Sequence, residues 1–213
     1  QRVRDLADEL LDSFPPADTE PKVFLGEQFD RGLAWVHFPE GHGGLGLNAK
    51  LQKTINERLY AQGAPNPMYR NPIGHGMCGP TVVAWGSEEQ KQRYLRPLFT
   101  GEEIWCQLFS EPGSGSDFAG LSSTGVQDGE EWIVNGQKVW TTLAHLSKWG
   151  LLVVRTDPQA VKHAGLTAFV VDMQDPTVEI RPLRQMTGEA EFNEVFFSDT
   201  RIPASEMLGS PGD

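Results

Sequence analysis

The stretch Gln107–Asp117 (QLFSEPGSGSD) decides the character of this chain, together with Asn135–Thr142 (NGQKVWTT). The first begins as an apolar strand and breaks into a loop of Gly and Ser. Small residues in such a loop let backbone N–H groups approach an anion, and the hydroxyls add donors. The second stretch brings an indole and two hydroxyls. An aromatic face, hydroxyl donors and a phosphate-tolerant loop suit a planar dinucleotide cofactor, so the two stretches predict a flavin site.

Each of these features has a plainer interpretation. The Gly113–Ser116 loop lacks the glycine spacing and the following helix of the βαβ dinucleotide fingerprint, so no nicotinamide site is predicted. Most Gly-Ser loops are ordinary turns. A lone Trp in a strand, such as Trp140, more often packs in a core. The flavin hypothesis therefore depends on both stretches acting together.

Composition excludes several classes of protein. The 213 residues contain 29 Asp and Glu against 18 Lys and Arg, a formal net charge of −11. This balance argues against binding to nucleic acid or to an anionic membrane through a general electrostatic field. Cys78 and Cys106 lie in no Cys-x-x-Cys pattern, so neither a disulfide framework nor a zinc or other metal site is predicted.

The two ends carry further expectations. No apolar run has transmembrane length, and Gln1–Asp5 lacks the apolar core of a signal peptide, which predicts a cytoplasmic protein. The chain starts with Gln1 rather than Met and ends in the loop-like Gly209–Asp213. We therefore expect the chain to be part of a longer protein.

Residues 1–103 are predicted to form an N-terminal α-helical bundle. Apolar residues recur there every three or four positions, which gives each helix one buried stripe. Asn48 is the expected N-cap of one helix, and Ser87 with Gln90 forms a capping box for another. Gly101 is expected to end that helix in the left-handed conformation. The stripe residues are Val3, Leu6, Ala7, Leu10, Leu11, Leu51, Ile55 and Leu59.

Residues 104–213 are predicted to form an antiparallel β-barrel or sandwich, so the fold class is α+β. Asp128-Gly129 and Asn135-Gly136 are expected to close tight hairpins. Closely spaced strands without intervening helices favour an antiparallel all-β domain. Beyond the second hairpin, strands are expected at Trp149–Val154, Thr167–Val171, Val178–Ile180 and Glu194–Phe197.

Four ordered matches, each of one stretch or of a pair of stretches, resemble the acyl-CoA dehydrogenase family, a group of FAD enzymes. They are Pro39–Gly46 (PEGHGGLG), the helical pair Gly79–Thr81 and Gly86–Lys91, the two stretches quoted first, and Gly188–Phe197 (GEAEFNEVFF). His42 departs from the family, in which Tyr or Phe is usual. The resemblance implies that residues 1–103 are the N-terminal helical domain and residues 104–213 the flavin-binding middle domain.

The resemblance also implies the site residues. Gln107, Phe109 and Ser110 would face the isoalloxazine ring, and Ser110 stands where many relatives carry Thr. Ser116 would lie by the FAD pyrophosphate and the acyl-CoA ligand. Trp140 would pack on the flavin, and Thr142 would hydrogen-bond near N5. The full set of implied FAD-binding residues is Gln107, Phe109, Ser110, Gly115, Ser116, Trp140, Thr141 and Thr142, with Ser116 also binding substrate.

The implied reaction is α,β-dehydrogenation of an acyl-CoA thioester with hydride transfer to the flavin. In relatives the base is a carboxylate of a C-terminal helical domain that this chain lacks, so no catalytic residue is assigned. An electron-transfer flavoprotein and a homo- or hetero-oligomer are the implied partners. Two alternatives stay open: an acyl-CoA oxidase-like flavoenzyme, and a non-catalytic subunit that pairs with an active paralogue.

Other polar residues receive no role. No Ser/His/Asp grouping or metal spacing involves His42, His75 or His145, so these are expected to be surface or packed histidines. Charged side chains in strands usually point to solvent, and no phosphate contact is assigned to them. This applies to Lys138, Arg155, Arg181 and Arg184.

Overall fold

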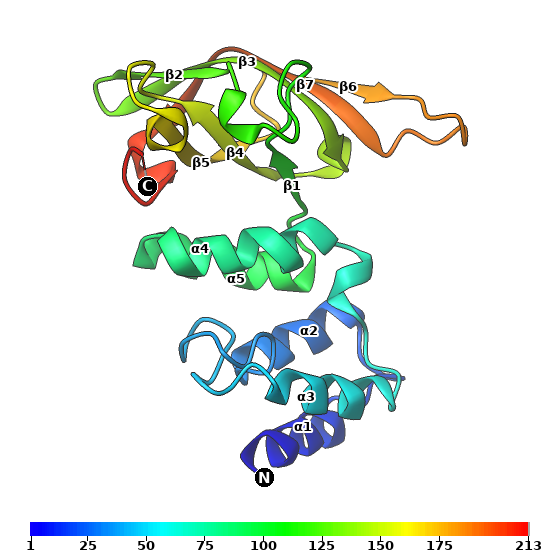
Figure 1. Ribbon diagram of the computed structural model, residues 1–213. Helices are drawn as coiled ribbons and strands as arrows, with labels where there is room; N and C mark the ends of the chain where they lie inside the picture. The colour runs from blue at the N-terminus through cyan, green and yellow to red at the C-terminus, as the bar shows by residue number, and fades with distance from the viewer. Residues whose placement is uncertain (213) are drawn as a thin grey trace. The chain divides into compact units, whose positions relative to one another are not determined.

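A computed structural model describes residues 1–212. The chain forms two compact units, one of Gln1–Ala84 with Glu88–Glu103, the other of Trp85–Ser87 with the segment from Ile104 onward. Figure 1 shows helices in the first and a sheet in the second. The predicted order of a helical part followed by a β part is confirmed.

The helical unit is organised around short amphipathic helices. Val3 and Leu10 on one helix and Ile55 and Leu59 on another are buried in one cluster, as the apolar spacing predicts. The α-helices are α1 (Arg2–Ser13), α2 (Pro21–Asp30), α3 (Leu51–Tyr60), α4 (Gly79–Trp85) and α5 (Glu88–Thr100), with the shorter turns η1 (Pro67–Tyr69) and η2 (Gly74–Cys78).

Two predicted helix boundaries have different outcomes. Gly101 follows α5 with φ +70°, as expected for a left-handed C-terminal glycine. The N-cap predicted at Asn48 is wrong, because Lys50 is the N-cap of α3. Asn48 Oδ1 instead accepts a hydrogen bond from the Lys50 amide at 2.9 Å, in the turn that leads into the helix.

The β unit is one open sheet in the order β6-β7-β3-β2-β4-β5-β8, with β1 paired to β4. The fold class is confirmed, but the sheet does not close into a barrel, since β6 and β8 are the end strands of this order. β1 pairs in parallel with β4, and Thr124 of β2 meets Arg155 of β4 in parallel, so the sheet is not purely antiparallel. The strands are β1 (Trp105–Leu108), β2 (Thr124–Asp128), β3 (Glu131–Thr142), β4 (Trp149–Arg155), β5 (Leu166–Asp172), β6 (Val178–Leu183), β7 (Phe192–Pro203) and β8 (Met207–Leu208), and the 3₁₀ turns are η3 (Phe118–Gly120), η4 (Ala144–Leu146), η5 (Lys162–Gly165) and η6 (Ala204–Glu206).

Only one of the two predicted hairpins forms. Asp128-Gly129 joins the antiparallel strands β2 and β3, with Gly129 at φ +64°. Asn135-Gly136 does not turn the chain, because β3 continues through it beside β7. Asn135 Nδ2 and Oδ1 bond to Asp199 Oδ1 and N, both at 2.9 Å, across a bulge in β7. A Cβ at position 136 would clash with Ser123, so glycine serves close packing here.

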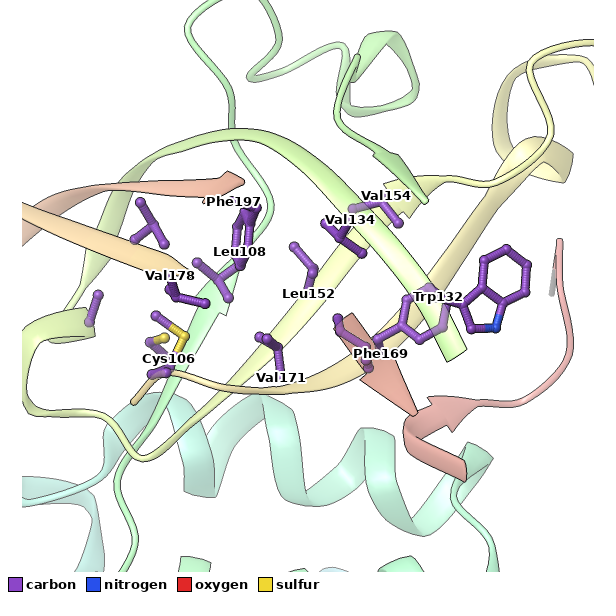
Figure 2. Close-up of a cluster of buried hydrophobic side chains, with 14 residues drawn as sticks. Cys106, Leu108, Trp132, Val134, Leu152, Val154, Phe169, Val171, Val178 and Phe197 are labelled. Atoms are coloured by element: carbon purple, nitrogen blue, oxygen red, sulfur yellow. The ribbon is translucent and has the colours of Figure 1, made fainter. Parts of the chain in front are cut away.

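Buried apolar side chains from β1, β3, β4, β5, β6 and β7 form the core of the sheet (Figure 2). Phe169 of β5 is fully buried, and its ring centroid is 5.4 Å from that of Trp132 on β3. Cys106 of β1 is also fully buried, and burial raises the pKa of its thiol to about 12. This core supports the strand ends from which the candidate site is built.

Candidate functional site

The Gly-Ser loop begins with a tight turn at Glu111 and Ser114. The exposed residues Gly115 and Ser116 follow this turn and form the rim of the loop. Glu111 and Ser114 exchange two backbone hydrogen bonds of 2.7 and 3.1 Å. Ser114 Oγ donates to the Asp117 carbonyl at 2.6 Å, which fixes the base of the loop. Gly115 and Ser116 are exposed, and a Cβ at position 115 would meet nothing within 4 Å. The predicted phosphate-binding residues therefore lie on an accessible backbone.

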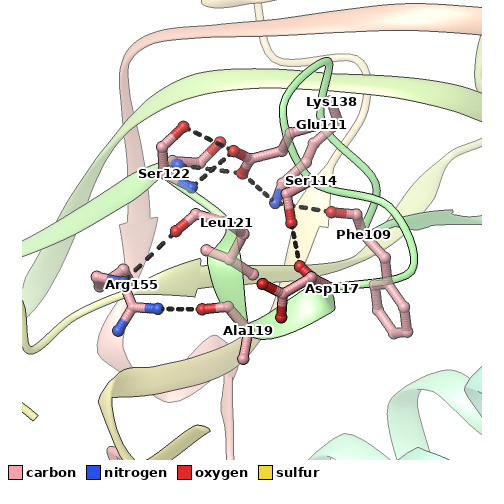
Figure 3. Close-up of polar contacts among 10 residues, drawn as sticks. Phe109, Glu111, Ser114, Asp117, Ala119, Leu121, Ser122, Lys138 and Arg155 are labelled. Atoms are coloured by element: carbon pink, nitrogen blue, oxygen red, sulfur yellow. Dashed lines mark hydrogen bonds and ion pairs between the residues drawn. The ribbon is translucent and has the colours of Figure 1, made fainter. Parts of the chain in front are cut away.

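A buried ion pair joins this loop to β3 (Figure 3). Lys138 Nζ lies 2.8 Å from Glu111 Oε1, and the two side chains are 0% and 3% exposed. Lys138 Nζ also donates to the Phe109 carbonyl at 3.2 Å. Ser122 donates to Glu111 Oε2 through its amide at 2.7 Å and its hydroxyl at 2.8 Å, and the Ser123 amide donates to Oε1 at 3.0 Å. Both oxygens of the Glu111 carboxylate thus accept hydrogen bonds within the fold.

The expectation that Lys138 points to solvent is wrong. Trp132, Val134 and Lys138 occupy every second position of β3, and all three are buried. That alternation is visible in the sequence and could have identified the inward direction of Lys138. Its partner Glu111 could not have been identified in this way, because it lies in a loop without periodicity.

The prediction that the strand arginines point to solvent holds for two of them and not for Arg155. Arg155 is only half-exposed, and it donates to the carbonyls of Ala119 at 2.6 Å and Leu121 at 3.5 Å, so it braces the same loop (Figure 3). Arg181 and Arg184 are exposed, as expected. Arg155 therefore has a structural contact that its place in a strand did not suggest.

The surroundings of Glu111 keep its side chain ionised near neutral pH. Burial alone would raise the pKa of Glu111, but hydrogen bonds from Lys138 and from Ser122 and Ser123 outweigh burial and lower the pKa from 4.5 to about 2. Burial also lowers the pKa of Lys138, and the Glu111 carboxylate opposes that shift. A carboxylate held in this way is unsuited to accept a proton from substrate near neutral pH.

The depressed pKa of Glu111 predicts an acid-sensitive contribution to stability. The folded pKa lies below the unfolded value, so the contribution is complete above about pH 4.5 and is lost as the pH falls towards about 2. We expect Glu111→Gln to be less stable than the unsubstituted protein at pH 7, with the difference shrinking between pH 4.5 and 2. Denaturant unfolding at a series of pH values measures it, and a difference independent of pH would contradict it.

A bulge in β3 determines where Trp140 points. Lys138 pairs with Val195 and Thr141 with Asn193, so Val139 and Trp140 both stand opposite a single residue of β7. Trp140 adopts φ +60°, and the residue is 63% exposed. Trp140 is therefore not packed in the core, which is the plainer interpretation of a Trp in a strand, and its side chain has an open face.

The same bulge brings the two sequence stretches together. The Val139 amide donates to the Ser110 carbonyl at 2.8 Å, so Ser110 lies beside the residue that precedes Trp140. The indole also meets the Phe192 ring edge-to-face at a centroid distance of 6.2 Å. Ser110 therefore pairs with the residue next to Trp140, and the prediction that the two residues share a site remains a prediction.

The other predicted residues differ in accessibility. The Phe109 ring packs against that of Phe118 in a tilted arrangement with centroids 5.1 Å apart, and Gln107 and Thr142 are half-buried. Thr141 is 1% exposed, and within residues 1–212 its Oγ1 has no hydrogen-bond partner. The Thr141 carbonyl accepts from Asn193 Nδ2 at 2.9 Å. Among the predicted contacts, Thr141 is therefore the least accessible to a ligand.

These residues fit a flat aromatic ligand that carries an anion. The indole of Trp140 offers an open ring face, and the exposed Gly115 and Ser116 offer backbone and hydroxyl donors. Over the part of the chain that the structure describes, no cluster of three or more His, Cys, Asp or Glu residues could hold a metal ion. No helix among residues 1–212 is long and apolar enough to cross a lipid bilayer.

The chain matches two models of one protein family. The model described as acyl-CoA dehydrogenase, N-terminal domain, matches residues 1–102, and the model for the middle domain matches residues 106–200. The acyl-CoA dehydrogenase IpdE1 of Mycobacterium tuberculosis is 44% identical over 182 residues, covering 85% of this chain and 47% of the relative. The chain thus spans about half the length of the curated relatives it matches.

Solved structures agree with the sequence matches. An acyl-CoA dehydrogenase from Geobacillus kaustophilus is 30% identical with a TM-score of 0.70, covering 98% of this chain and 53% of that one. The ChsE4-ChsE5 complex from Mycobacterium tuberculosis is 27% identical with a TM-score of 0.72, covering 99% of this chain and 56% of the other. Since the family models together match almost all of residues 1–200, and the fold agrees, the chain belongs to the acyl-CoA dehydrogenase family.

Proposed function

We propose that the protein carrying this chain is an FAD-dependent acyl-CoA dehydrogenase that removes hydrogen from the α and β carbons of an acyl-CoA thioester. The main support is the junction of Ser110 with Trp140: one backbone hydrogen bond, from Val139 to Ser110, brings the predicted ring-binding residues together at an exposed face. Family membership supplies the chemistry that such a face would serve. Residues 1–103 and 104–213 would be its helical and flavin-binding domains.

The proposed roles of the site residues follow from the resemblance to the acyl-CoA dehydrogenase family. When bound, FAD would supply the acceptor for the hydride that leaves the β carbon. Trp140 packs its indole against the ring, while Ser110 and Thr142 donate hydroxyl hydrogen bonds along the ring edge. Gly115 and Ser116 bind the phosphates, and Ser116 also contacts the acyl-CoA. Gln107 of β1, Phe109 in the loop after it and the buried Thr141 of β3 complete the proposed site.

We assign no catalytic base to residues 1–213. Glu111 is excluded as a base because its carboxylate is held by Lys138, Ser122 and Ser123. Under this proposal a carboxylate outside these residues takes the α proton, and its pKa must be raised by burial for that task. We propose an electron-transfer flavoprotein as the electron acceptor, and a homo- or hetero-oligomer, for which the two-protein ChsE4-ChsE5 complex is a precedent.

Replacing the exposed indole tests the cofactor site. We expect Trp140→Ala to weaken FAD binding about ten- to a hundredfold, since loss of an aromatic stacking partner removes on the order of 1–3 kcal/mol. The measurement is a titration of FAD into flavin-free protein. Trp85→Ala is the matched control, because Trp85 is also exposed, at 54%, and lies outside the predicted site. Equal FAD affinity in the two variants would show that the ring packs elsewhere.

A panel of acyl-CoA thioesters of different length, branching and ring content decides between the proposed function and its alternatives. Bleaching of the flavin absorbance by one thioester, with slow reoxidation by oxygen, supports a dehydrogenase. Rapid reoxidation by oxygen supports an acyl-CoA oxidase-like enzyme. A flavin-loaded protein that no thioester bleaches supports a non-catalytic subunit.

A further inference from the structure

We infer that Glu111 and Lys138 are a positioning pair that holds the β3 bulge, and with it the outward conformation of Trp140. This inference rests on the proposed function, because it treats Trp140 as the residue that meets the flavin. It assigns the pair a role in setting the shape of the cofactor site, while the two charged groups themselves remain sealed from any ligand.

The conformation of Trp140 has to be imposed by its surroundings. A non-glycine residue at φ +60° is in the left-handed region, where the Cβ crowds the following carbonyl. Such a conformation persists only where neighbouring contacts over-determine it. The ladder with β7 pairs with Lys138 and Thr141 on either side of the bulge, but its register is broken between these two residues.

Further contacts to the residues before the indole come from the loop after β1. Lys138 Nζ bonds to the Phe109 carbonyl and to Glu111 Oε1, at 3.2 and 2.8 Å. The next residue, Val139, donates its amide to Ser110 at 2.8 Å. Three consecutive loop residues are thus bound to the two residues that immediately precede the indole.

Burial of the charges makes this arrangement selective. If β3 slipped by one residue, the ammonium of Lys138 would move to the other face of the sheet and leave the Glu111 carboxylate buried without its partner. That cost disfavours a one-residue slip away from the observed register, in which the bulge lies at Val139 and Trp140. Neutral hydrophobic residues would not discriminate between registers as strongly.

The pair also connects the two ends of the loop. Ser122 and Ser123 donate to the Glu111 carboxylate, while Lys138 holds the same carboxylate from β3. Gly115 and Ser116 lie on the segment enclosed between these anchors. The same buried pair therefore fixes the segment before the indole of Trp140 and both ends of the loop that carries Gly115 and Ser116.

The test is FAD binding by the complete flavoprotein carrying Lys138→Met. We expect at least about tenfold weaker binding, in line with the loss of a buried charge partner. Because an indole lying on a flavin quenches its emission, we also expect stronger fluorescence per bound flavin. Lys148→Met is the control, since Lys148 forms a 2.7 Å ion pair with Asp172 that is 30–40% exposed. The control should keep wild-type affinity and quenching.

A double-variant cycle separates positioning from a general loss of structure. If the pair acts through Trp140, Lys138→Met should weaken binding much less in a Trp140→Ala background than in the wild type. Equal effects in both backgrounds, or wild-type affinity and quenching in folded Lys138→Met, would overturn the inference.

Two further measurements distinguish failure of this inference from failure of the proposed function. If Lys138→Met does not fold, Glu111→Gln replaces it in the test, because the amide keeps the side-chain volume and one acceptor oxygen. We expect Glu111→Gln to weaken FAD binding, though by less than the roughly tenfold expected for Lys138→Met. If neither variant folds, the pair is structural only and the inference is wrong. Absence of FAD from the unsubstituted protein would instead overturn the proposed function.

Discussion

Substitution of Lys138 by Met is expected to lower the free energy of unfolding of the β unit by about 3–5 kcal/mol, the usual cost of leaving a buried charge without its partner. Lys138 is fully buried, and it is the only cation among residues 1–212 recorded in an ion pair with Glu111. Without it, the carboxylate keeps only the donors of Ser122 and Ser123. Denaturant unfolding followed by circular dichroism measures the change.

Two variants make this expectation specific. Lys148→Met removes a partly exposed ion pair and should cost about 1 kcal/mol or less. The double variant Glu111→Gln, Lys138→Met should recover part of the stability lost in Lys138→Met, because no uncompensated charge then remains. A loss below about 1 kcal/mol for Lys138→Met, or no recovery in the double variant, would show that the pair does not behave as a desolvated pair.

Phe169→Ala is expected to destabilise the β unit by about 3–5 kcal/mol, as typical for removal of a buried aromatic ring. Phe169 is 0% exposed and lies in the cluster that also contains Trp132, Val134 and Leu152 (Figure 2). Deleting the ring loses its transfer free energy and leaves a cavity between β3 and β5. Thermal and denaturant unfolding both report the change.

Control variants for this prediction differ in the size of the side chain that is removed and in its burial. Phe169→Leu should cost clearly less than Phe169→Ala, because a smaller cavity remains. Val161→Ala, at a residue that is 79% exposed, should stay within about 0.5 kcal/mol of the wild type. If Phe169→Ala cost no more than Val161→Ala, the cluster would not be the tightly packed core described above.

Local patterns in the sequence were sufficient for most of the fold. The three- and four-residue spacing of Val3, Leu10, Ile55 and Leu59 predicts helices with one buried stripe, and these stripes do meet. Asp128-Gly129 predicts a hairpin that forms. In each case the determining interactions connect residues close in sequence, so a short window contains the necessary information.

Predictions failed where a distant residue changed the outcome of a local pattern. Asn135-Gly136 has the composition of a hairpin, but Asp199 pairs with Asn135, and the close approach of Ser123 requires the glycine. Lys138 was expected at the surface, and the Glu111 carboxylate holds it inside. Asp199 is 64 residues from Asn135, and Glu111 is 27 residues from Lys138, so a short sequence window around either residue does not contain its partner.

The sequence by itself determined the family resemblance, the helix-then-sheet order, and the residue types of a flavin site in Gln107–Asp117 and Asn135–Thr142. Only the tertiary structure decided that β3 bulges beside β7, that Trp140 points outward, and that Lys138 is sealed against Glu111. The reason is physical: strand register and the burial of a charge depend on the energy of pairing between segments far apart in the chain.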